Sequence, residues 1–163
     1  MDILRRAEIE VKTVSVNEGR EVTGSHGITV LADITKPEAK CGIAEAVVLP
    51  GGIPGTPNLQ KDDKVKEIVM DCYENGKYVC AICAAPSILG EWGLLKGKKA
   101  TCYPGFEDKL KGALYVSDRV ITDGNVTTSR GLGTSLELGL RLLEIFTDKE
   151  NAEAMARKVQ FVC

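Results

Sequence analysis

The sequence has few of the features that mark membrane, exported or nucleic-acid-binding proteins. No apolar stretch among its 163 residues is long enough to cross a bilayer, and the stretch from Met1 to Arg6 lacks the apolar middle of a signal peptide. The 21 basic and 23 acidic residues give a net charge of -2 with no run of one sign. Electrostatics therefore favour neither nucleic acid nor an anionic membrane surface as a partner, and we expect a cytoplasmic protein.

Histidine, a common metal ligand, is also scarce. The chain has one histidine, His26, and six cysteines that are too dilute and too irregularly spaced for a disulfide-built scaffold. Cys80 and Cys83 form a C-x-x-C motif, which is typical of a redox pair or half a zinc site, but no second C-x-x-C accompanies it. The pair lies at a predicted strand, where side chains three apart point to opposite faces, so a disulfide is disfavoured and no metal is expected.

Short apolar runs alternate with amphipathic helices, which predicts a single α/β domain over residues 1–163 with a mostly parallel sheet. Apolar residues make up 44% of the chain, enough to bury a core. The run Ala46–Leu49 is apolar throughout, as expected of a strand covered on both faces. The predicted strands are Ile9–Val16, Ile28–Ala32, Ala46–Leu49, Tyr78–Ile82, Lys99–Cys102, Val120–Thr122 and Val126–Thr128.

Helices are predicted between these strands. The stretch Asp62–Gly76 has apolar residues at the spacing of a surface helix, a second helix starts at a capping box formed by Thr134 and Glu137, and a third covers Asp148–Val159. The stretch Asp2–Ala7 has the pattern of a helix end that leads directly into a strand. Because a doubly wound domain normally opens with a strand, we expect a first strand and part of a helix to be missing.

The clearest chemical signal is the segment Ala81–Ser87, which follows the predicted strand at Tyr78 and contains Cys83. Small residues on both sides of Cys83 permit a tight strand-to-helix turn that lifts a nucleophile above the sheet. A thiol at a helix N-terminus gains thiolate character, and the carboxyl ends of strands are where open α/β sheets bind ligands. On the local pattern alone, an inert buried cysteine is an equally good interpretation.

Two further loops follow strands. In Leu49–Gly55, Gly51 and Gly52 permit close approach of a substrate to the backbone and can aim amides at an oxyanion, although a plain strand-end turn fits as well. In Thr127–Ser135 the glycines suggest the same, and Arg130 is either an anion-binding group or a surface salt-bridge partner.

Together these blocks resemble the DJ-one/ThiJ/PfpI family, specifically the branch with the parkinsonism-associated deglycase. The resemblance covers nearly the whole chain, and an ordered set of blocks is more specific than any single motif. It implies a flavodoxin-like three-layer sandwich, usually a homodimer, that needs no cofactor. The matching blocks are Asp2–Ala7, Gly24–Gly27, Ala46–Gly52, Ala81–Pro86 and Thr128–Ser135.

The resemblance also assigns roles to residues. Cys83 corresponds to the reactive nucleophile, and the amides of Gly52 and Ala84 correspond to the oxyanion site. His26 matches a position from which family members supply a polar group to the partner subunit's thiol, although an ordinary surface histidine is the slightly favoured interpretation. Gly51, Tyr103 and Arg130 are the remaining candidates for the substrate pocket.

The chain departs from the family in two places. Some members have a histidine near the thiol after the elbow helix, where this chain has Tyr103, which donates a hydrogen bond but is a poor base. The family's acidic residue that hydrogen-bonds the cysteine follows the first strand, which we expect to be missing here. The alternatives are a misassigned start, a cleaved product, a protein expressed without this segment, or a rearranged oligomer in which another chain fills the gap.

The resemblance implies a cysteine-dependent glyoxalase or deglycase that acts on methylglyoxal-like dicarbonyls or their protein adducts. The alternative is an oxidative-stress sensor or chaperone that works through oxidation of Cys83 without turnover. A PfpI-like peptidase ranks lower, because Ala84 stands where such enzymes usually place a histidine. A thiazole-biosynthesis role ranks lower too, because the chain has no phosphate-binding motif.

Overall fold

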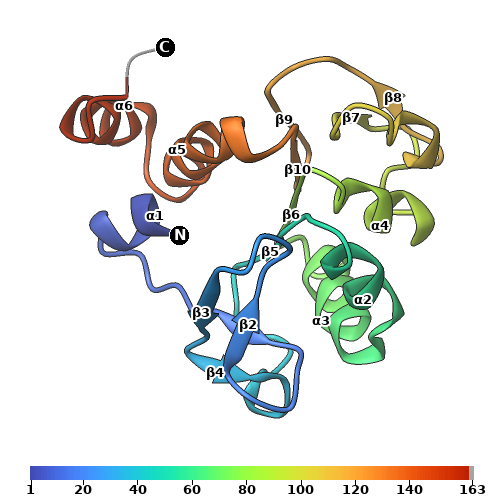
Figure 1. The fold of residues 1–163 in the computed structure, drawn as a ribbon. Helices are drawn as coiled ribbons and strands as arrows, with labels where there is room; N and C mark the ends of the chain where they lie inside the picture. The colour runs from blue at the N-terminus through green and yellow to red at the C-terminus, as the bar shows by residue number, and fades with distance from the viewer. Residues whose placement is uncertain (162–163) are drawn as a thin grey trace.

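A computed structural model of the chain describes residues 1–161. Figure 1 shows a central sheet with helices on both faces, the three-layer arrangement expected of a flavodoxin-like fold. The central strand β6 (Tyr78–Ile82) shows how the layers are held together. Val79 and Ala81 point into one hydrophobic cluster, whereas Cys80 points into a second cluster on the other face. This period of two is that of a strand buried on both sides.

Within residues 1–161, the central sheet has four strands in the order β5-β6-β10-β9. Strands β5, β6 and β10 are parallel, and β9 is antiparallel to β10, so the prediction of a mostly parallel sheet is confirmed. The predicted bounds of β5 and β6 match the structure, and those of β9 and β10 each lack one residue. The strands are β5 (Ala46–Leu49), β6, β9 (Val120–Asp123) and β10 (Val126–Ser129).

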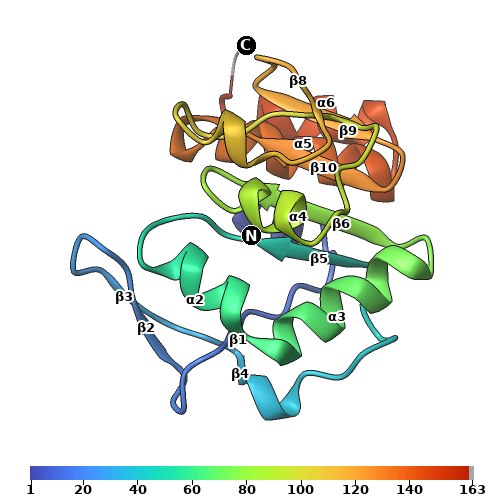
Figure 2. The same cartoon turned by 90° about the vertical axis from the view of Figure 1, so that its right-hand side faces the viewer.

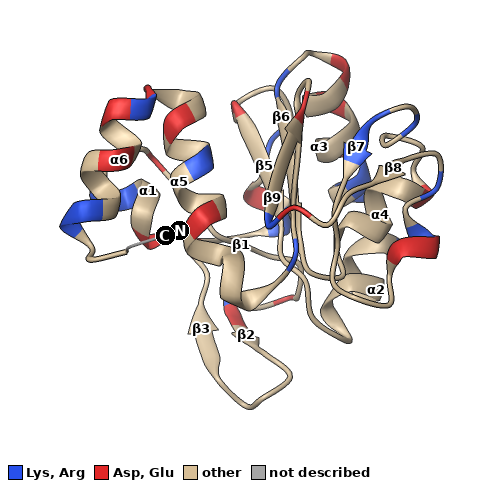
Figure 3. Cartoon of the chain, turned by 90° about the horizontal axis from the view of Figure 1, so that it is seen from above, with Lys and Arg blue, Asp and Glu red and all other residues tan. Residues whose placement is uncertain are grey.

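Helices cover the two faces of this sheet. One face packs against α2 (Gly55–Lys61), α3 (Asp63–Glu74) and α4 (Pro86–Glu91). The other face packs against α1 (Asp2–Arg6), α5 (Ser135–Phe146) and α6 (Lys149–Lys158). Single 3₁₀ turns lie at η1 (Lys36–Glu38), η2 (Glu107–Lys109) and η3 (Leu132–Thr134). In Figure 3 basic and acidic residues are interspersed on the outer helices.

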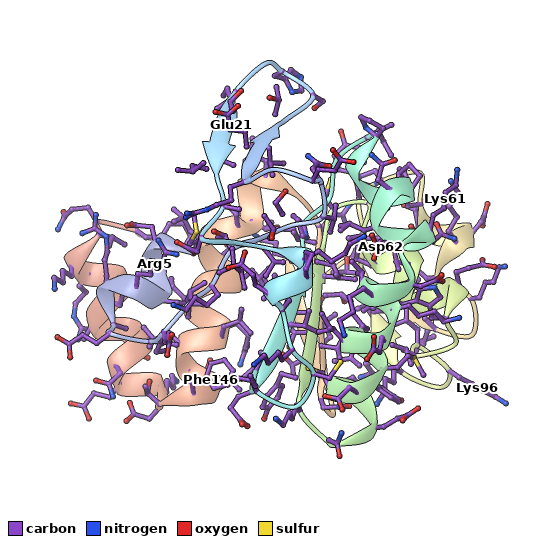
Figure 4. All side chains as sticks on the ribbon, turned by 90° about the horizontal axis from the view of Figure 1, so that it is seen from below. Arg5, Glu21, Lys61, Asp62, Lys96 and Phe146 are labelled. Atoms are coloured by element: carbon purple, nitrogen blue, oxygen red, sulfur yellow. The ribbon has the colours of Figure 1, made fainter. Side chains whose placement is uncertain are left out.

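Helix α3 forms for the reasons expected from the sequence. Its buried residues Val65, Val69 and Cys72 lie on one face. The carboxylate of Asp62, labelled in Figure 4, accepts hydrogen bonds from the backbone amides of Lys64 and Val65 and caps the first turn.

The capping box predicted at the start of α5 is wrong. The hydroxyl of Thr134 is hydrogen-bonded to the hydroxyl of Ser129 at 2.6 Å and to the backbone of Gly131, so it does not cap the helix. Glu137 instead accepts from Nε of Arg119 at 2.7 Å. Hydrogen bonds of Thr134 to Ser129 and Gly131, and of Glu137 to Arg119, thus replace the capping box.

In the described part of the chain, three two-stranded sheets accompany the central sheet. Strands β1 (Val14–Ser15) and β4 (Ile34–Thr35) are parallel, as are β7 (Lys99–Ala100) and β8 (Leu114–Tyr115). Strands β2 (Glu21–Thr23) and β3 (Thr29–Leu31) form a hairpin that projects from the body of the molecule in Figures 2 and 3. The predicted strands Ile9–Val16, Ile28–Ala32 and Lys99–Cys102 were therefore too long, because only their paired parts are strands.

The expectation that Ala46–Leu49 is covered on both faces is wrong. Among the strands that the structure describes, β5 is the last on its side of the sheet, and Val48 has 42% of its surface exposed. In the part of the chain that the structure describes, no helix is long and apolar enough to cross a membrane.

Candidate functional site

Cys83 lies in the turn between the end of β6 and the start of α4. Its φ angle is 66°, a left-handed conformation that is rare for residues other than glycine. Two hydrogen bonds hold its backbone: its amide donates to the carbonyl of Ser129 at 2.9 Å, and its carbonyl accepts from the amide of Tyr103 at 2.8 Å. The side chain is partly exposed. The predicted strand-to-helix elbow is therefore present, and it presents the thiol at the carboxyl end of β6.

Gly51 packs directly against this elbow. A β-carbon at Gly51 would lie 2.5 Å from Cβ of Cys83, 2.7 Å from the carbonyl oxygen of Ile82 and 3.1 Å from the amide nitrogen of Ala84. Only a residue without a side chain fits at such distances. The loop after β5 thus lies against Cys83, as the resemblance implied.

The two residues whose amides are proposed to form the oxyanion site, Gly52 and Ala84, each follow one of the two residues in this contact. Gly52 is the next residue of the loop, is exposed, and has a φ of 96°. Its carbonyl accepts from the amide of Thr56 at 2.8 Å, so the loop turns directly into α2. Ala84 is buried, and its carbonyl accepts from the hydroxyl of Ser87 at 2.7 Å. Ala84 follows Cys83 in the chain, and Gly52 follows Gly51, which packs against Cys83. The use of their amides in binding an oxyanion stays a prediction.

The third loop reaches the site through Tyr103 and Gly131. A β-carbon at Gly131 would lie 3.4 Å from the Tyr103 ring, which is half-exposed. Arg130 donates to the hydroxyl of Tyr115, at the end of β8, at 3.3 Å and to the carbonyl of Ser117 at 3.2 Å. Within residues 1–161, Arg130 therefore binds two neutral groups, and the surface salt bridge considered from the sequence is not formed.

The other described cysteines lie in surroundings that suppress thiolate formation. Burial raises the pKa of Cys80 to about 12 and that of Cys102 to about 11, and it also raises the pKa of Cys72. Burial and the adjacent Glu67 carboxylate, which accepts a hydrogen bond from the thiol at 3.3 Å, raise the pKa of Cys41. All five cysteines in the described part of the chain are free, so Cys80 and Cys83 form no disulfide.

His26 lies in the turn of the β2–β3 hairpin, and its Nδ1 is 3.1 Å from the hydroxyl of Ser25. Because this hairpin projects from the body of the molecule, the structure does not bring His26 to Cys83 within one chain (Figure 2). The role that the resemblance implies for His26 requires a second subunit and stays a prediction.

Two hydroxyl residues support the site and were missed from the sequence. Ser129 accepts the amide of Cys83 through its carbonyl, and its own hydroxyl is bonded to Thr134 and to the carbonyl of Arg119. Thr128 accepts from the buried amide of Thr101 at 2.9 Å. A run of polar residues in a strand that is buried on both faces is the signal that would have indicated such a network.

A cleft of about 370 Å³ lies beside the Gly52 loop, between α2, α4 and η2. Cys83 is not among its lining residues, so this cleft borders the thiol site without containing it. In residues 1–161 no group of three or more His, Cys, Asp or Glu side chains is placed to hold a metal. The cleft is lined by Ile53, Thr56, Pro57, Gln60, Ser87, Glu91, Phe106, Asp108, Lys109 and Lys111.

Comparison with known proteins agrees with this geometry. The model of the DJ-1/PfpI family matches residues 1–145. Protein dj-1beta of Drosophila melanogaster is 35% identical over 158 residues, which are 96% of this chain and 84% of that protein. Protein DJ-1 homolog B of Arabidopsis thaliana is 40% identical over 154 residues, or 93% of this chain. The chain spans only 35% of that plant protein's length.

A solved structure shows the same similarity in three dimensions. The crystal structure of a cysteine-to-alanine mutant of the DJ-1 superfamily protein STM1931 from Salmonella typhimurium has a TM-score of 0.93 and 34% identity. The match covers 99% of this chain and 89% of that chain. The flavodoxin-like fold inferred from the sequence is thereby confirmed.

Proposed function

The chain belongs to the DJ-1/PfpI family, and from this we propose that it is a cofactor-independent enzyme of the glyoxalase or deglycase type. Its substrates in this proposal are methylglyoxal-like dicarbonyls or their early adducts with proteins. The observation that carries the proposal is the position of Cys83. It is a partly exposed thiol on a left-handed elbow, next to two backbone segments that offer amides.

The chemistry begins with addition of the Cys83 thiolate to the aldehyde carbon of methylglyoxal. The new C–S bond turns the carbonyl oxygen into an oxyanion, which the amides of Gly52 and Ala84 would stabilise. Protonation of this oxygen gives a hemithioacetal. A base removes the proton from its C–H carbon while the neighbouring ketone oxygen is protonated, which gives an enediol. Loss of the proton from the first hydroxyl and protonation of the former ketone carbon then give a lactoyl thioester, and water hydrolyses the thioester to lactate and restores the thiol.

The proton transfers in this sequence need a base close to the sulfur. Among residues 1–161, no side chain is hydrogen-bonded to Sγ of Cys83. The hydroxyl of Tyr103 is a poor base at neutral pH. We therefore expect the 163-residue protein by itself to bind and add to dicarbonyls faster than it completes turnover.

Lactate release from methylglyoxal by the purified protein tests the proposal. We expect Cys83→Ser to abolish the release, and Cys41→Ser, which changes another partly exposed thiol, to preserve it. Formation of a covalent adduct at residue 83, detected by mass spectrometry, distinguishes a protein that stops after the first step from one that does not react. Unchanged lactate release in Cys83→Ser would contradict the assignment.

A second candidate is a redox sensor that works through Cys83. It is favoured by the contrast between this thiol and the others, since Cys72, Cys80 and Cys102 are buried with raised pKa values. Accessible thiols are the ones oxidised to sulfenic and sulfinic acids. Mild peroxide followed by mass spectrometry would add two oxygens at Cys83 alone, whereas oxidation spread over several cysteines would count against a sensor.

We also propose that the protein forms a homodimer through the β2–β3 hairpin. The hairpin exposes the apolar residues Ile28, Val30 and Leu31, each more than half accessible, beside His26. A projecting apolar hairpin is a common site of protein association. Sedimentation analysis of the wild type and of Val30→Lys tests this idea, and a wild type that is monomeric at all concentrations would contradict it.

A further inference from the structure

The cleft beside the Gly52 loop has the dimensions of a binding site. Its volume of about 370 Å³ is within the range of sites that hold small organic molecules. Thr56 and Gln60 line it from α2, and Ser87 lines it from α4, one helical turn beyond the elbow at Cys83. Figure 2 shows α2 and α4 on the same side of the sheet. A ligand in this cleft therefore lies near the thiol site but outside it.

Part of the cleft's lining is apolar. Ile53 is 56% exposed, and Pro57 and Phe106 are partly exposed. Phe106 also packs against the hydrophobic core, so its ring is held in place. Partly exposed apolar side chains around a cleft favour a ligand with an aliphatic or flat portion.

Three polar side chains of the lining have no partner in the part of the chain that the structure describes. Thr56 is only 3% exposed, and its hydroxyl forms no hydrogen bond there. Buried hydroxyls without a partner are uncommon and cost stability. The amide of Gln60 and the carboxylate of Asp108 likewise form no hydrogen bond or ion pair within residues 1–161. Each of these three groups can accept a hydrogen bond from a ligand.

The basic groups of the lining, in contrast, are already engaged. Nζ of Lys111 lies 2.5 Å from the carboxylate of Glu91. Nζ of Lys109 lies over the ring of Phe106, 4.7 Å from its centroid. Of the four charged groups around the cleft, Asp108 is thus the one without a partner among residues 1–161. A cation with several N–H donors complements this set of acceptors.

We propose that this cleft binds a guanidinium group on a short aliphatic stem, as carried by an arginine side chain or by a free alkylguanidine. The planar group has five N–H donors, so it can bind the carboxylate of Asp108 with two of them and still donate to Gln60 and Thr56. Its stem packs on the apolar lining at Ile53 and Pro57. An ammonium group is a poorer ligand, because it has three donors and is more strongly hydrated.

The experiment is a titration of the ¹⁵N-labelled 163-residue protein, followed by NMR. The ligand is n-butylguanidinium, and the comparison is n-butylurea, which has a similar shape but no charge. We expect n-butylguanidinium to shift the amide signals of residues 53–60 and 87–91 with a Kd on the order of 1 mM. n-Butylurea should bind about fivefold more weakly, because it lacks the charge that pairs with Asp108.

A second pair of ligands identifies the source of the guanidinium group. N-acetyl-arginine amide carries it on a peptide-like backbone, and N-acetyl-citrulline amide is the neutral counterpart. Shifts of the same signals by the arginine compound, and not by the citrulline compound, would support an arginine side chain as the ligand. Shifts by n-butylguanidinium alone would support a free alkylguanidine.

Two variants and a matched control test the residues. Asp108→Asn should weaken binding of n-butylguanidinium about threefold. Thr56→Val should weaken it about threefold as well, and it should leave the midpoint of urea unfolding unchanged because the hydroxyl that it removes has no partner. Glu18→Gln removes an exposed carboxylate in the loop between β1 and β2 and should leave binding unchanged.

Three outcomes would overturn the proposal: no shifts in the cleft up to about 20 mM n-butylguanidinium, equal affinity for n-butylurea, or unchanged affinity in Asp108→Asn. A lower unfolding midpoint for Thr56→Val would count against the part assigned to this hydroxyl. All of these measurements can be made in a Cys83→Ser background, so their failure is separable from a failure of the proposed enzymatic function.

Discussion

Gly51 lies so close to Cys83 that a β-carbon on it would come within 2.5 Å of the cysteine's own β-carbon. The left-handed backbone of Cys83 and the bare backbone of Gly51 therefore depend on each other. The elbow projects the thiol toward the loop after β5, and that loop can pass only because its residue has no side chain. The carboxyl ends of two neighbouring parallel strands are joined into one site by this contact.

Substitution of Gly51 by alanine should damage both stability and chemistry. The new methyl group meets the backbone at Ile82 and Ala84 as well as Cβ of Cys83, so the elbow has to move. We expect the free energy of unfolding to fall by about 1–3 kcal/mol, as for other overpacked sites. Displacement of the thiol by about an ångström should reduce adduct formation with methylglyoxal on the order of a hundredfold.

Gly19→Ala is the control for this substitution, because a β-carbon there has no atom within 4 Å and the residue does not adopt a positive φ. Urea unfolding and the rate of adduct formation at Cys83 are the two measurements. If Gly51→Ala matched Gly19→Ala in both, the close contact between the loop and the elbow would be wrong.

The cysteines should react with iodoacetamide in a fixed order. At pH 8 we expect Cys83 to be alkylated first, because it is partly exposed on the elbow. Cys80 and Cys102 are fully buried, with pKa values raised by burial to about 12 and about 11, so they should remain unmodified in the folded protein. Peptide mapping by mass spectrometry gives the order, in a Cys163→Ser background that removes the C-terminal thiol. Alkylation of Cys102 as fast as Cys83 would contradict the structure.

Much of the site followed from the sequence, because short runs next to strands determined it. The apolar run Ala46–Leu49 and the small residues around Cys83 predicted β5 and the elbow, and the periodicity of Asp62–Gly76 predicted α3. In these segments the local pattern and the tertiary environment favour the same residues, so the local pattern was sufficient to predict the structure.

What the sequence did not predict depends on distant partners. The stretch Ile9–Val16 has the alternation of a long strand, but only Val14–Ser15 is paired, because β4 is its one neighbouring strand in residues 1–161. The exposure of Val48 depends likewise on which strand lies next to β5. The role of Ser129, whose carbonyl holds the amide of Cys83, depends on the register between β10 and β6. A single sequence does not contain this information.

The hydroxyl of Thr128 provides a test of the buried network below the site. It accepts a hydrogen bond from the amide of Thr101, and both residues are almost completely buried. Thr128→Val keeps the volume but leaves this amide without its partner, so we expect a loss of about 1–3 kcal/mol in the free energy of unfolding. Thr23→Val, at an exposed hydroxyl pair in the hairpin, should cost no more than about 0.5 kcal/mol. Equal effects in urea titrations would show that the buried hydrogen bond contributes little.

Asp33 connects the start of the chain to β1 and should make stability depend on acid pH. Its carboxylate accepts from the amide and the hydroxyl of Thr13, each at 2.7 Å, and from Arg5 of α1 at 2.5 Å (Figure 4 labels Arg5). The bonds from Thr13, with a smaller contribution from the charge of Arg5, lower the pKa of Asp33 from 3.8 to about 2. The folded state thus favours the ionised carboxylate.

Because the pKa is lower in the folded state, the stabilisation from Asp33 is complete above about pH 4 and is lost as the pH falls from 3.8 toward 2. Asp33→Asn should therefore lower the melting temperature at pH 7 and make the difference from the wild type shrink between pH 4 and pH 2. Both side chains of the ion pair are partly exposed, so added salt should reduce the contribution of Arg5 but not the hydrogen bonds from Thr13. Asp108→Asn, which removes an exposed carboxylate in η2, should show no such pH-dependent difference. Thermal unfolding at pH 7, 4, 3 and 2 is the measurement, and a difference for Asp33→Asn that persists unchanged to pH 2 would mean that another group sets the acid limit of stability.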